Sequence, residues 1–339
     1  MTNLVETYKK LYNLKTINVK GVKEGSISFM FFDYEDFYSL GTENFISYSS
    51  NIGLRITDLV FNIEKIYDIK IFNFFPVCFT NNDSMLFACK IKKKSEKLVS
   101  LNKEVIKPIA GILKREIKYF TDDYDDELLL IEKYHRRYNF YQNFIKKYIL
   151  TEKKRRKREY LNLLNKFITE DDKKIVDVSC GDNKDIFKLY NENRFIVGND
   201  INCYHVRNGQ AINKSILFTN DNLLKLNYKD DLFDIAYCKN TLHHLNGQKE
   251  LQGALENLKR ISKKIIIVEI EDPKVTGGMP KFLNKYLYIK YLKDAGKKFL
   301  NFKVFKKSID SVYNDECNIS YLTFENVLGK YMIAIIEKR

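Results

Sequence analysis

From Lys173 to Asp272, short apolar segments alternate with amphipathic ones, and this order constrains the fold more than any other feature of the chain. The apolar segments have the length of buried strands, and several of the stretches between them have a helical pattern. They span residues 174–179, 195–201, 215–221, 232–238 and 264–272. Strands that alternate with helices form a parallel sheet with helices on both faces. We therefore expect an α/β fold with a Rossmann-like sheet in this region.

The length of 339 residues suits two domains. Residues 1–101 read as an N-terminal α+β domain, in which residues 71–80 and 84–93 flank the polar turn Asn81–Asp83 and predict a hairpin. Residues 102–168 have no glycine after Gly111 and are expected to form a helical connector. Residues 169–339 form the C-terminal domain, whose end, residues 319–338, predicts an antiparallel hairpin.

Composition excludes several classes of protein. With 45% hydrophobic and 30% charged residues, the chain is neither disordered nor collagen-like. Six cysteines without a C-x-x-C pair provide no zinc framework and favour a reduced, cytoplasmic setting. The first residues lack an apolar core of signal-peptide length, and no apolar run is long enough to cross a membrane. We expect a cytoplasmic protein with no integral membrane segment.

The net charge of +14 favours polyanionic partners, although an AT-rich genome that encodes much lysine produces the same sum. The densest basic run is Lys153–Arg158. We favour a solvated helix face or connector for it, and a nucleic-acid contact is the alternative. An acidic run, Asp122–Glu127, is interpreted as a solvated turn rather than a metal site.

The most informative polar residues follow three of the predicted strands. Residues 177–183 (Asp-Val-Ser-Cys-Gly-Asp-Asn) form a turn of small residues before a helix, where backbone amides can approach a ligand closely. Asp200 ends the second strand and can accept hydrogen bonds from both hydroxyls of a ribose. Asp221 and Asn222 follow the third strand and suit an adenine edge. Together they predict a pocket for an adenosine with a carboxylate-bearing tail.

These motifs resemble the class I S-adenosylmethionine-dependent methyltransferases, especially the ubiquinone/menaquinone methyltransferase-like branch. Residues 177–181 are similar to the family's D-x-G-C-G motif, and residues 240–245 contain its frequent L-H-H-L sequence. The resemblance implies a seven-stranded sheet with an antiparallel last strand and S-adenosylmethionine as cofactor. The implied cofactor-binding residues are Asp177, Ser179, Cys180, Gly181, Asn183, Asp200, Ile201, Asp221, Asn222 and Cys238. Ser179 and Asn183 replace glycines of the motif, and we interpret both as tolerated variations.

Methyl transfer is an in-line displacement, so a base is needed only for an acceptor that must lose a proton early. Candidates after the fourth strand are Lys239, Asn240, His243 and His244. Either histidine could act as a base at neutral pH, and His243 is preferred because it lies nearer the strand. No metal site is expected.

Residues 274–307 occupy the position of the family's substrate lid. They contain ten lysines and one acidic residue, interleaved with aromatic side chains. A solvated cover helix would show this pattern, and so would a surface for an anionic or aromatic acceptor, RNA or a membrane.

The sequence therefore predicts a methyltransferase that acts on a small-molecule or metabolite acceptor, with the N-terminal domain recognising the acceptor or forming a dimer. The first alternative is an RNA methyltransferase, which the basic charge supports. The Asn-Pro-Pro-Tyr type of motif used for base-amine methylation is absent, since Cys238–Thr241 stands there. The second alternative is a non-catalytic methyltransferase-like binding scaffold.

Overall fold

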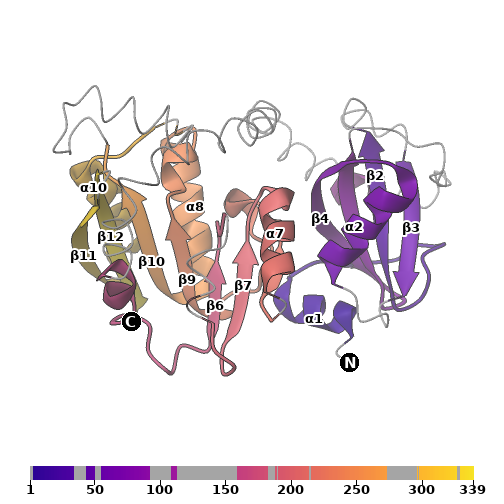
Figure 1. Ribbon diagram of the computed structural model, residues 1–339, viewed down its shortest axis with the longest axis horizontal. Helices are drawn as coiled ribbons and strands as arrows, with labels where there is room; N and C mark the ends of the chain where they lie inside the picture. Colours follow the sequence, from indigo (N-terminus) through magenta and orange to yellow (C-terminus); the bar gives the residue numbers. More distant parts are fainter. Residues whose placement is uncertain are drawn as a thin grey trace. The chain divides into compact units, whose positions relative to one another are not determined.

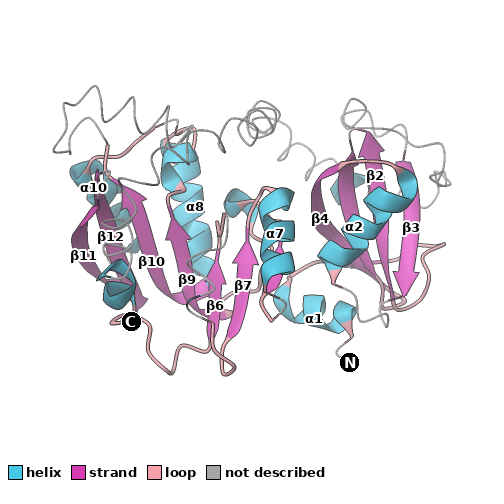
Figure 2. Cartoon of the chain, viewed as in Figure 1, coloured by secondary structure: helices cyan, strands magenta, loops and turns pink. Residues whose placement is uncertain are grey.

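The computed structural model describes residues 3–33, 43–49, 55–91, 108–112, 159–181, 188, 190–213, 215–272, 296, 298–326 and 329–339 (Figures 1 and 2). The chain divides into two compact units. The first comprises Met1–Leu129, Asp200–Asp221 and Asn227–Lys229. The second comprises Leu130–Asn199, Asn222–Leu226 and Asp230–Arg339.

A five-stranded sheet in the order β1-β4-β5-β2-β3 forms the centre of the first unit. Its strands are β1 (Thr16–Ile17), β2 (Ser26–Asp33), β3 (Glu43–Ser49), β4 (Ile71–Thr80) and β5 (Met85–Ile91). Strands β4 and β5 are antiparallel, which confirms the predicted hairpin, whereas β2 and β5 are parallel. The sheet is mixed, as an α+β domain allows.

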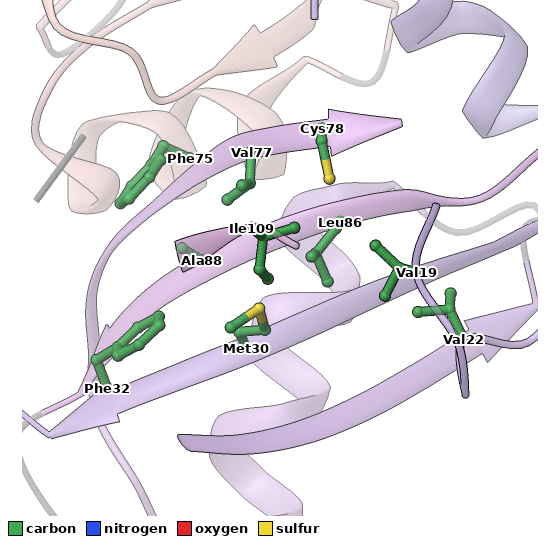
Figure 3. Packing of buried hydrophobic residues seen from close by; sticks show 10 residues of the cluster. All are labelled: Val19, Val22, Met30, Phe32, Phe75, Val77, Cys78, Leu86, Ala88 and Ile109. Carbon is green, nitrogen blue, oxygen red and sulfur yellow. The ribbon is translucent and has the colours of Figure 1, made fainter. Parts of the chain in front are cut away.

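Strands β4 and β5 are buried along their whole length, which explains why their sequences are mostly apolar instead of alternating. Side chains of β2, β4 and β5, among them Met30, Phe75 and Leu86, form one buried apolar cluster (Figure 3). Val19 and Val22, which lie between β1 and β2, also belong to this cluster, as does Ile109.

Two helices contribute further buried faces to the first unit. Helix α1 (Leu4–Leu11) begins at Asn3, whose side chain caps it, and buries Tyr8 against Phe87 of β5 with ring centroids 5.7 Å apart. Helix α2 (Ile56–Tyr67) buries the face that carries Leu59, Val60 and Ile63.

The larger sheet has seven strands in the order β11-β12-β10-β9-β6-β7-β8. Their bounds are β6 (Lys174–Asp177), β7 (Phe195–Asn199), β8 (Leu217–Thr219), β9 (Phe233–Lys239), β10 (Ser262–Ile270), β11 (Cys317–Asn326) and β12 (Gly329–Lys338). Strand β6 is parallel to β7 and β9, and β9 is parallel to β10. Strand β12 is antiparallel to β10 and β11. The seven-stranded sheet, its antiparallel last strand and the C-terminal hairpin are thus confirmed.

Helices and short 3-10 turns stand between the strands of the larger sheet along the chain. They are α7 (Cys203–Ile212), η2 (Leu223–Lys225), η3 (Leu242–His244), α8 (Gln248–Ile261) and α10 (Phe302–Tyr313). Helix α8 buries apolar residues at helical spacing, including Leu251, Leu255 and Leu258. Helix α10 packs beside it, with the Tyr313 hydroxyl donating to the carbonyl of Leu255 at 2.6 Å.

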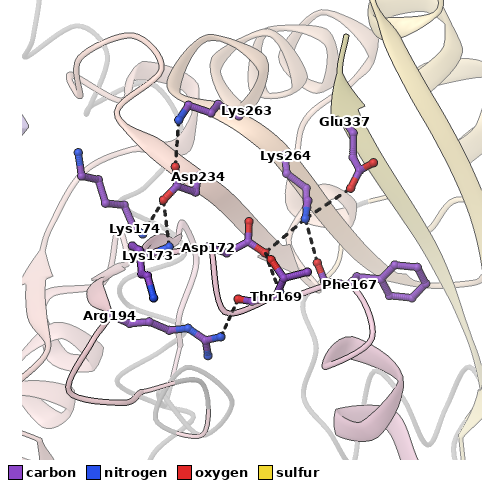
Figure 4. Close-up of polar contacts among 10 residues, drawn as sticks. All are labelled: Phe167, Thr169, Asp172, Lys173, Lys174, Arg194, Asp234, Lys263, Lys264 and Glu337. Atoms are coloured by element: carbon purple, nitrogen blue, oxygen red, sulfur yellow. Dashed lines mark hydrogen bonds and ion pairs between the residues drawn. The ribbon is translucent and has the colours of Figure 1, made fainter.

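Polar contacts hold the amino ends of the parallel strands (Figure 4). The backbone N–H groups of Lys173 and Lys174 donate to Asp234 at 3.0 and 2.9 Å, and Lys263 donates to the same carboxylate. Lys264 lies 3.3 Å from Asp172. This network joins the amino ends of the strands. Ligands of open α/β sheets bind at the opposite edge, beyond the carboxyl ends of the strands.

Candidate functional site

The strand order reverses at β6, whose neighbours are β7 and β9, and open α/β sheets bind ligands at the carboxyl side of such a point. Asp177 ends β6 with only 4% of its surface exposed, and its Oδ1 accepts the Ser179 N–H at 3.2 Å. The Cys180 N–H donates to the carbonyl of Asn199 at 2.8 Å, and the Asn199 side chain donates to the carbonyl of Val178. The turn after β6 is therefore fixed by the end of β7.

Gly181 ends the described part of this turn with a φ of +51°, a conformation that favours glycine. No described atom lies within 4 Å of the position that a Cβ would take there. The turn thus combines a fixed backbone with a Cβ position at Gly181 that no described residue fills. A ligand group could lie directly against the backbone at this position.

Ser179, which replaces a glycine of the family motif, links the turn after β6 to the loop after β9. Thr241 Oγ1 donates to Ser179 Oγ at 2.5 Å and also contacts the carbonyl of Lys239 at 2.9 Å. Asn240, between them, adopts a left-handed conformation with φ +51°. The serine therefore has a structural partner, which supports its interpretation as a variation. Thr241 was not singled out from the sequence, because nothing in its neighbourhood indicates this contact.

Cys238, predicted to line the cofactor site, is buried at the end of β9, 4.0 Å from Ser179 Oγ. Burial, together with the charge of Glu269, raises the pKa of its thiol to about 12. The thiol is thus neutral at physiological pH. Because the thiolate is the nucleophilic form, Cys238 does not act as a nucleophile.

The raised pKa of Cys238 predicts a loss of stability in alkali. Between pH 9 and 12 the unfolded thiol has lost its proton and the folded thiol has kept it, so the free energy of unfolding falls as pH rises, by about 1.4 kcal/mol per pH unit for each such group. Cys238→Ala should make that slope shallower by about this amount. Urea unfolding between pH 9.5 and 11 measures it, with Cys78→Ala as a second variant, because burial also raises the pKa of Cys78 to about 12. An unchanged slope in both variants would contradict the expectation.

His243, the preferred candidate base, is completely buried in η3. Its Nδ1 pairs with Oε1 of Glu269, and its ring stacks on Phe299 with centroids 4.9 Å apart. A Cβ on Gly296 would lie 2.5 Å from His243 Cδ2, so this packing requires glycine. His244 lies against His243, with ring centroids 4.2 Å apart. A catalytic role for either histidine stays a prediction, and the geometry of His243 is that of a packed residue.

Lys239, at the end of β9, lies over two tyrosine rings. Its ammonium is 4.4 Å from the ring centroid of Tyr160 and 5.6 Å from that of Tyr331. Such cation–π contacts hold an ammonium in a defined position. The Tyr160 hydroxyl is in turn 2.6 Å from that of Tyr237. The carboxyl end of β9 therefore carries the Lys239 ammonium between two tyrosine rings.

Asp200 directly follows β7 and is 8% exposed, and its Oδ1 accepts the N–H of Asn202 at 2.8 Å. Ile201 lies within this turn, and Asn202 caps α7. Asp221 is buried and accepts the hydroxyl of Tyr12. Burial, the charge of Asp221 and the neighbouring tyrosines raise the pKa of Tyr12 well above its usual value, so this hydroxyl stays protonated.

Asn222 caps η2 through its side-chain oxygen, which accepts the Leu224 N–H at 2.9 Å. Its Nδ2 is buried and has no hydrogen-bond partner within the described residues. A buried donor without a partner is costly, and an adenine ring nitrogen is an acceptor of the kind it lacks. The orphaned donor of Asn222, in the second unit, suits an adenine ring, and the carboxylate of Asp200, in the first unit, is of the kind that binds ribose hydroxyls.

Several predicted features lie outside the described residues. They are Asn183, the acidic run 122–127, the basic run 153–158, most of the connector 102–168, and residues 274–295 and 297 of the lid. Within the described residues, no group of three or more His, Cys, Asp or Glu side chains is placed to hold a metal ion. No helix of the described chain is long and apolar enough to cross a membrane.

Residues 169–302 match the family model described as a methyltransferase domain. The match covers less than half of the chain. S-adenosylmethionine as cofactor and the ubiquinone/menaquinone-like branch stay predictions. No curated protein matches the sequence closely enough to count as a relative.

Three solved structures resemble the chain at low identity. A SAM-dependent methyltransferase from Methanosarcina mazei is 18% identical over 52% of this chain and 96% of its own, with a TM-score of 0.40. A protein from Pyrococcus horikoshii is 17% identical over 61% and 99%, with a TM-score of 0.44. Magnesium protoporphyrin IX methyltransferase from Synechocystis, with bound SAH, is 13% identical over 62% and 99%, with a TM-score of 0.45. At these values the matches carry no argument about what this chain binds or acts on.

Proposed function

We propose that the chain is an S-adenosylmethionine-dependent methyltransferase that acts on a small-molecule acceptor. The observation that carries the proposal is the turn after β6, which is fixed at the switch point of the sheet and has no described atom within 4 Å of the Cβ position at Gly181. When bound, the cofactor supplies a sulfonium whose methyl group is open to in-line displacement. The proposed cofactor residues are those predicted from the sequence.

The chain's own residues would hold the cofactor in three ways. The turn 177–181 would let the carboxylate-bearing tail lie close to the backbone at Gly181. Asp200 would accept hydrogen bonds from the ribose hydroxyls, and Asn222 would donate its Nδ2 to the adenine ring. Cys238 would contribute a neutral, water-excluding surface, because its thiol is buried and protonated.

On the acceptor side, Lys239 and its two tyrosine rings support an anionic or aromatic acceptor. The ammonium would attract an acceptor anion, and the rings would provide apolar surface for an aromatic group. Because Lys239 is held in place by both rings, it would orient the acceptor and not only attract it. Orientation is the main contribution that a protein makes to a displacement of this kind.

Calorimetric titration with S-adenosylmethionine and S-adenosylhomocysteine tests the proposal. We expect micromolar binding to the wild type. Asp200→Ala should weaken it about 30-fold, because charge-assisted hydrogen bonds to the ribose are lost. Asp230→Ala is the matched control, since this aspartate is exposed and forms a surface ion pair with Arg260. Absence of binding at millimolar ligand, or equal loss in both variants, would contradict the proposed function.

The RNA alternative rests on the net charge of +14. Affinity for RNA that falls steeply with salt, combined with methyl transfer to RNA, would favour it over a small-molecule acceptor. RNA binding without any cofactor affinity would favour the non-catalytic scaffold. A cytoplasmic location, the domain boundaries at residues 101 and 168, and acceptor recognition or dimerisation by residues 1–101 stay predictions.

A further inference from the structure

The two aspartates proposed for the ribose and the adenine, Asp200 and Asp221, belong to the first compact unit together with α1, α2, β4 and β5. Segments of this unit therefore contribute contacts to the turns that carry these two residues. Three sets of contacts within this unit connect residues 1–91 to the segment that carries Asp200 and Asp221.

The first contact is made by Asn220, which is 2% exposed. Its Oδ1 accepts the backbone N–H of Phe74 in β4 at 3.0 Å. Its Nδ2 donates to the carbonyls of Asp200 and Ile201 at 2.6 and 2.7 Å. One side chain thus joins an N-terminal strand to the turn that carries Asp200. Only an amide of this length offers the acceptor and both donors.

Strand β1 pairs with β4 only at Phe79 and Thr80, so it does not pair with β4 at Phe74, where Asn220 binds. An unpaired N–H of a buried strand needs an acceptor, and Asn220 supplies it to Phe74. The amide therefore satisfies β4 and the Asp200 turn at the same time. Loss of the side chain would leave polar groups on both sides without their partner.

The second contact fixes α7, which begins just after the Asp200 turn. Arg207 of α7 forms a two-point pair with Glu64 of α2, at 2.6 and 3.0 Å. Its Nη2 also donates to the carbonyl of Ile71 at the start of β4, at 2.6 Å. Paired, mostly buried guanidinium–carboxylate contacts hold direction as well as distance. The turn that carries Asp200 is therefore held to β4 directly by Asn220, and to α2 and β4 through helix α7.

The third contact concerns Asp221. The Tyr12 hydroxyl donates to its carboxylate, and the Tyr12 ring stacks on Tyr228 with centroids 5.4 Å apart. The backbone adds to this, because Asn13 N–H donates to the carbonyl of Asn227 at 2.7 Å. The segment that follows α1 is thus bound beside the predicted adenine residue.

We propose that Asn220 is a positioning residue for the ribose end of the cofactor site, and that β4 of the N-terminal sheet is part of the support of that site. The inference rests on the proposed function. Asn220 holds the carbonyls of Asp200 and Ile201, and thereby sets the direction of the Asp200 carboxylate. The N-terminal unit then supports cofactor binding in addition to any role in acceptor recognition.

The test compares Asn220→Ala with Gln210→Ala in the full chain. Gln210 is a matched control, because it is a buried amide of the same unit that donates to Ile216 instead of the Asp200 turn. Both variants should melt a few degrees below the wild type. Only Asn220→Ala should weaken S-adenosylmethionine binding, by about tenfold, with KM for the cofactor raised and kcat at saturation retained. Wild-type affinity in a folded Asn220→Ala protein would overturn the inference.

Amide hydrogen exchange on the wild type provides a second readout that does not depend on the variant folding. Cofactor binding should slow exchange at the Phe74 N–H of β4, because this group is bound to Asn220. Asp200→Ala should abolish that added protection. Wild-type binding without any change at Phe74 would overturn the inference and leave the proposed function standing. No binding to the wild type would overturn both.

Discussion

Glu269→Ala is expected to lower the free energy of unfolding by about 3–5 kcal/mol, because it removes the acceptor of a buried hydrogen-bond cluster and leaves several donors unsatisfied. Glu269 is completely buried in β10. Its Oε2 accepts the N–H groups of Thr241 and Leu242 at 3.1 and 2.8 Å, and its Oε1 pairs with Nδ1 of His243. Removing the carboxylate leaves three donors of the loop after β9 without an acceptor. Urea unfolding followed by circular dichroism measures the loss.

Two further substitutions separate the contributions of this cluster. Glu269→Gln keeps an oxygen for the Thr241 and Leu242 N–H groups and an amide for the His243 ring, so it should cost about 1–2 kcal/mol. His243→Phe keeps the stack on Phe299 and leaves Glu269 bound to the backbone, so its cost should also be well below that of Glu269→Ala. If Glu269→Gln is as damaging as Glu269→Ala, the cluster is held by charge alone and the hydrogen-bond account is wrong.

This cluster bears on the role of His243. A base must reach the proton that it removes, and a completely buried ring that is paired at Nδ1 and stacked on Phe299 is poorly placed for that. The contacts suit a residue that shapes the loop after β9, which also carries Asn240 and Thr241. A positioning role would leave the pH profile of kcat unchanged in His243→Phe, whereas loss of a base would remove its acidic limb.

The sheet could be predicted from the sequence because its strands are short, apolar and separated by helical segments of regular length. Residues at strand ends could be predicted for the same reason, since the carboxyl ends of parallel strands lie on one edge. Asp177 and Asp200 are examples, and each is placed by the strand that precedes it.

Contacts between distant segments could not be predicted in this way. Glu269 stands within a continuous apolar strand, and nothing nearby indicates that it binds the backbone of residues 241 and 242. Asn220 looks like an ordinary turn residue, and its partner in β4 is 146 positions away. Tyr12 precedes its partner Asp221 by most of the chain. The order of the five-stranded sheet is a further case, because mixed pairing depends on tertiary packing and not on local pattern.

Gly181→Ala is expected to weaken S-adenosylmethionine binding by about 100-fold and to cost only about 1 kcal/mol of stability. The two effects separate because they have different causes. The folded protein bears the strain of a Cβ at φ +51°, which is modest. No described atom lies within 4 Å of that Cβ, so nothing already present in the described chain is displaced. A bound cofactor that lies against the backbone at this turn would meet the new methyl group directly, and overpacking of this kind costs about 1–3 kcal/mol.

Gly253→Ala is the matched control, because Gly253 lies inside α8 and its Cβ position likewise has no described atom within 4 Å outside the helix's own backbone. That substitution should stabilise the protein by about 1 kcal/mol through helix propensity and leave cofactor affinity unchanged. Calorimetric titration and urea unfolding of both variants complete the comparison. Equal affinity of Gly181→Ala and the wild type would mean that the cofactor does not approach this turn, and the proposed site would have to be abandoned even if binding itself were observed.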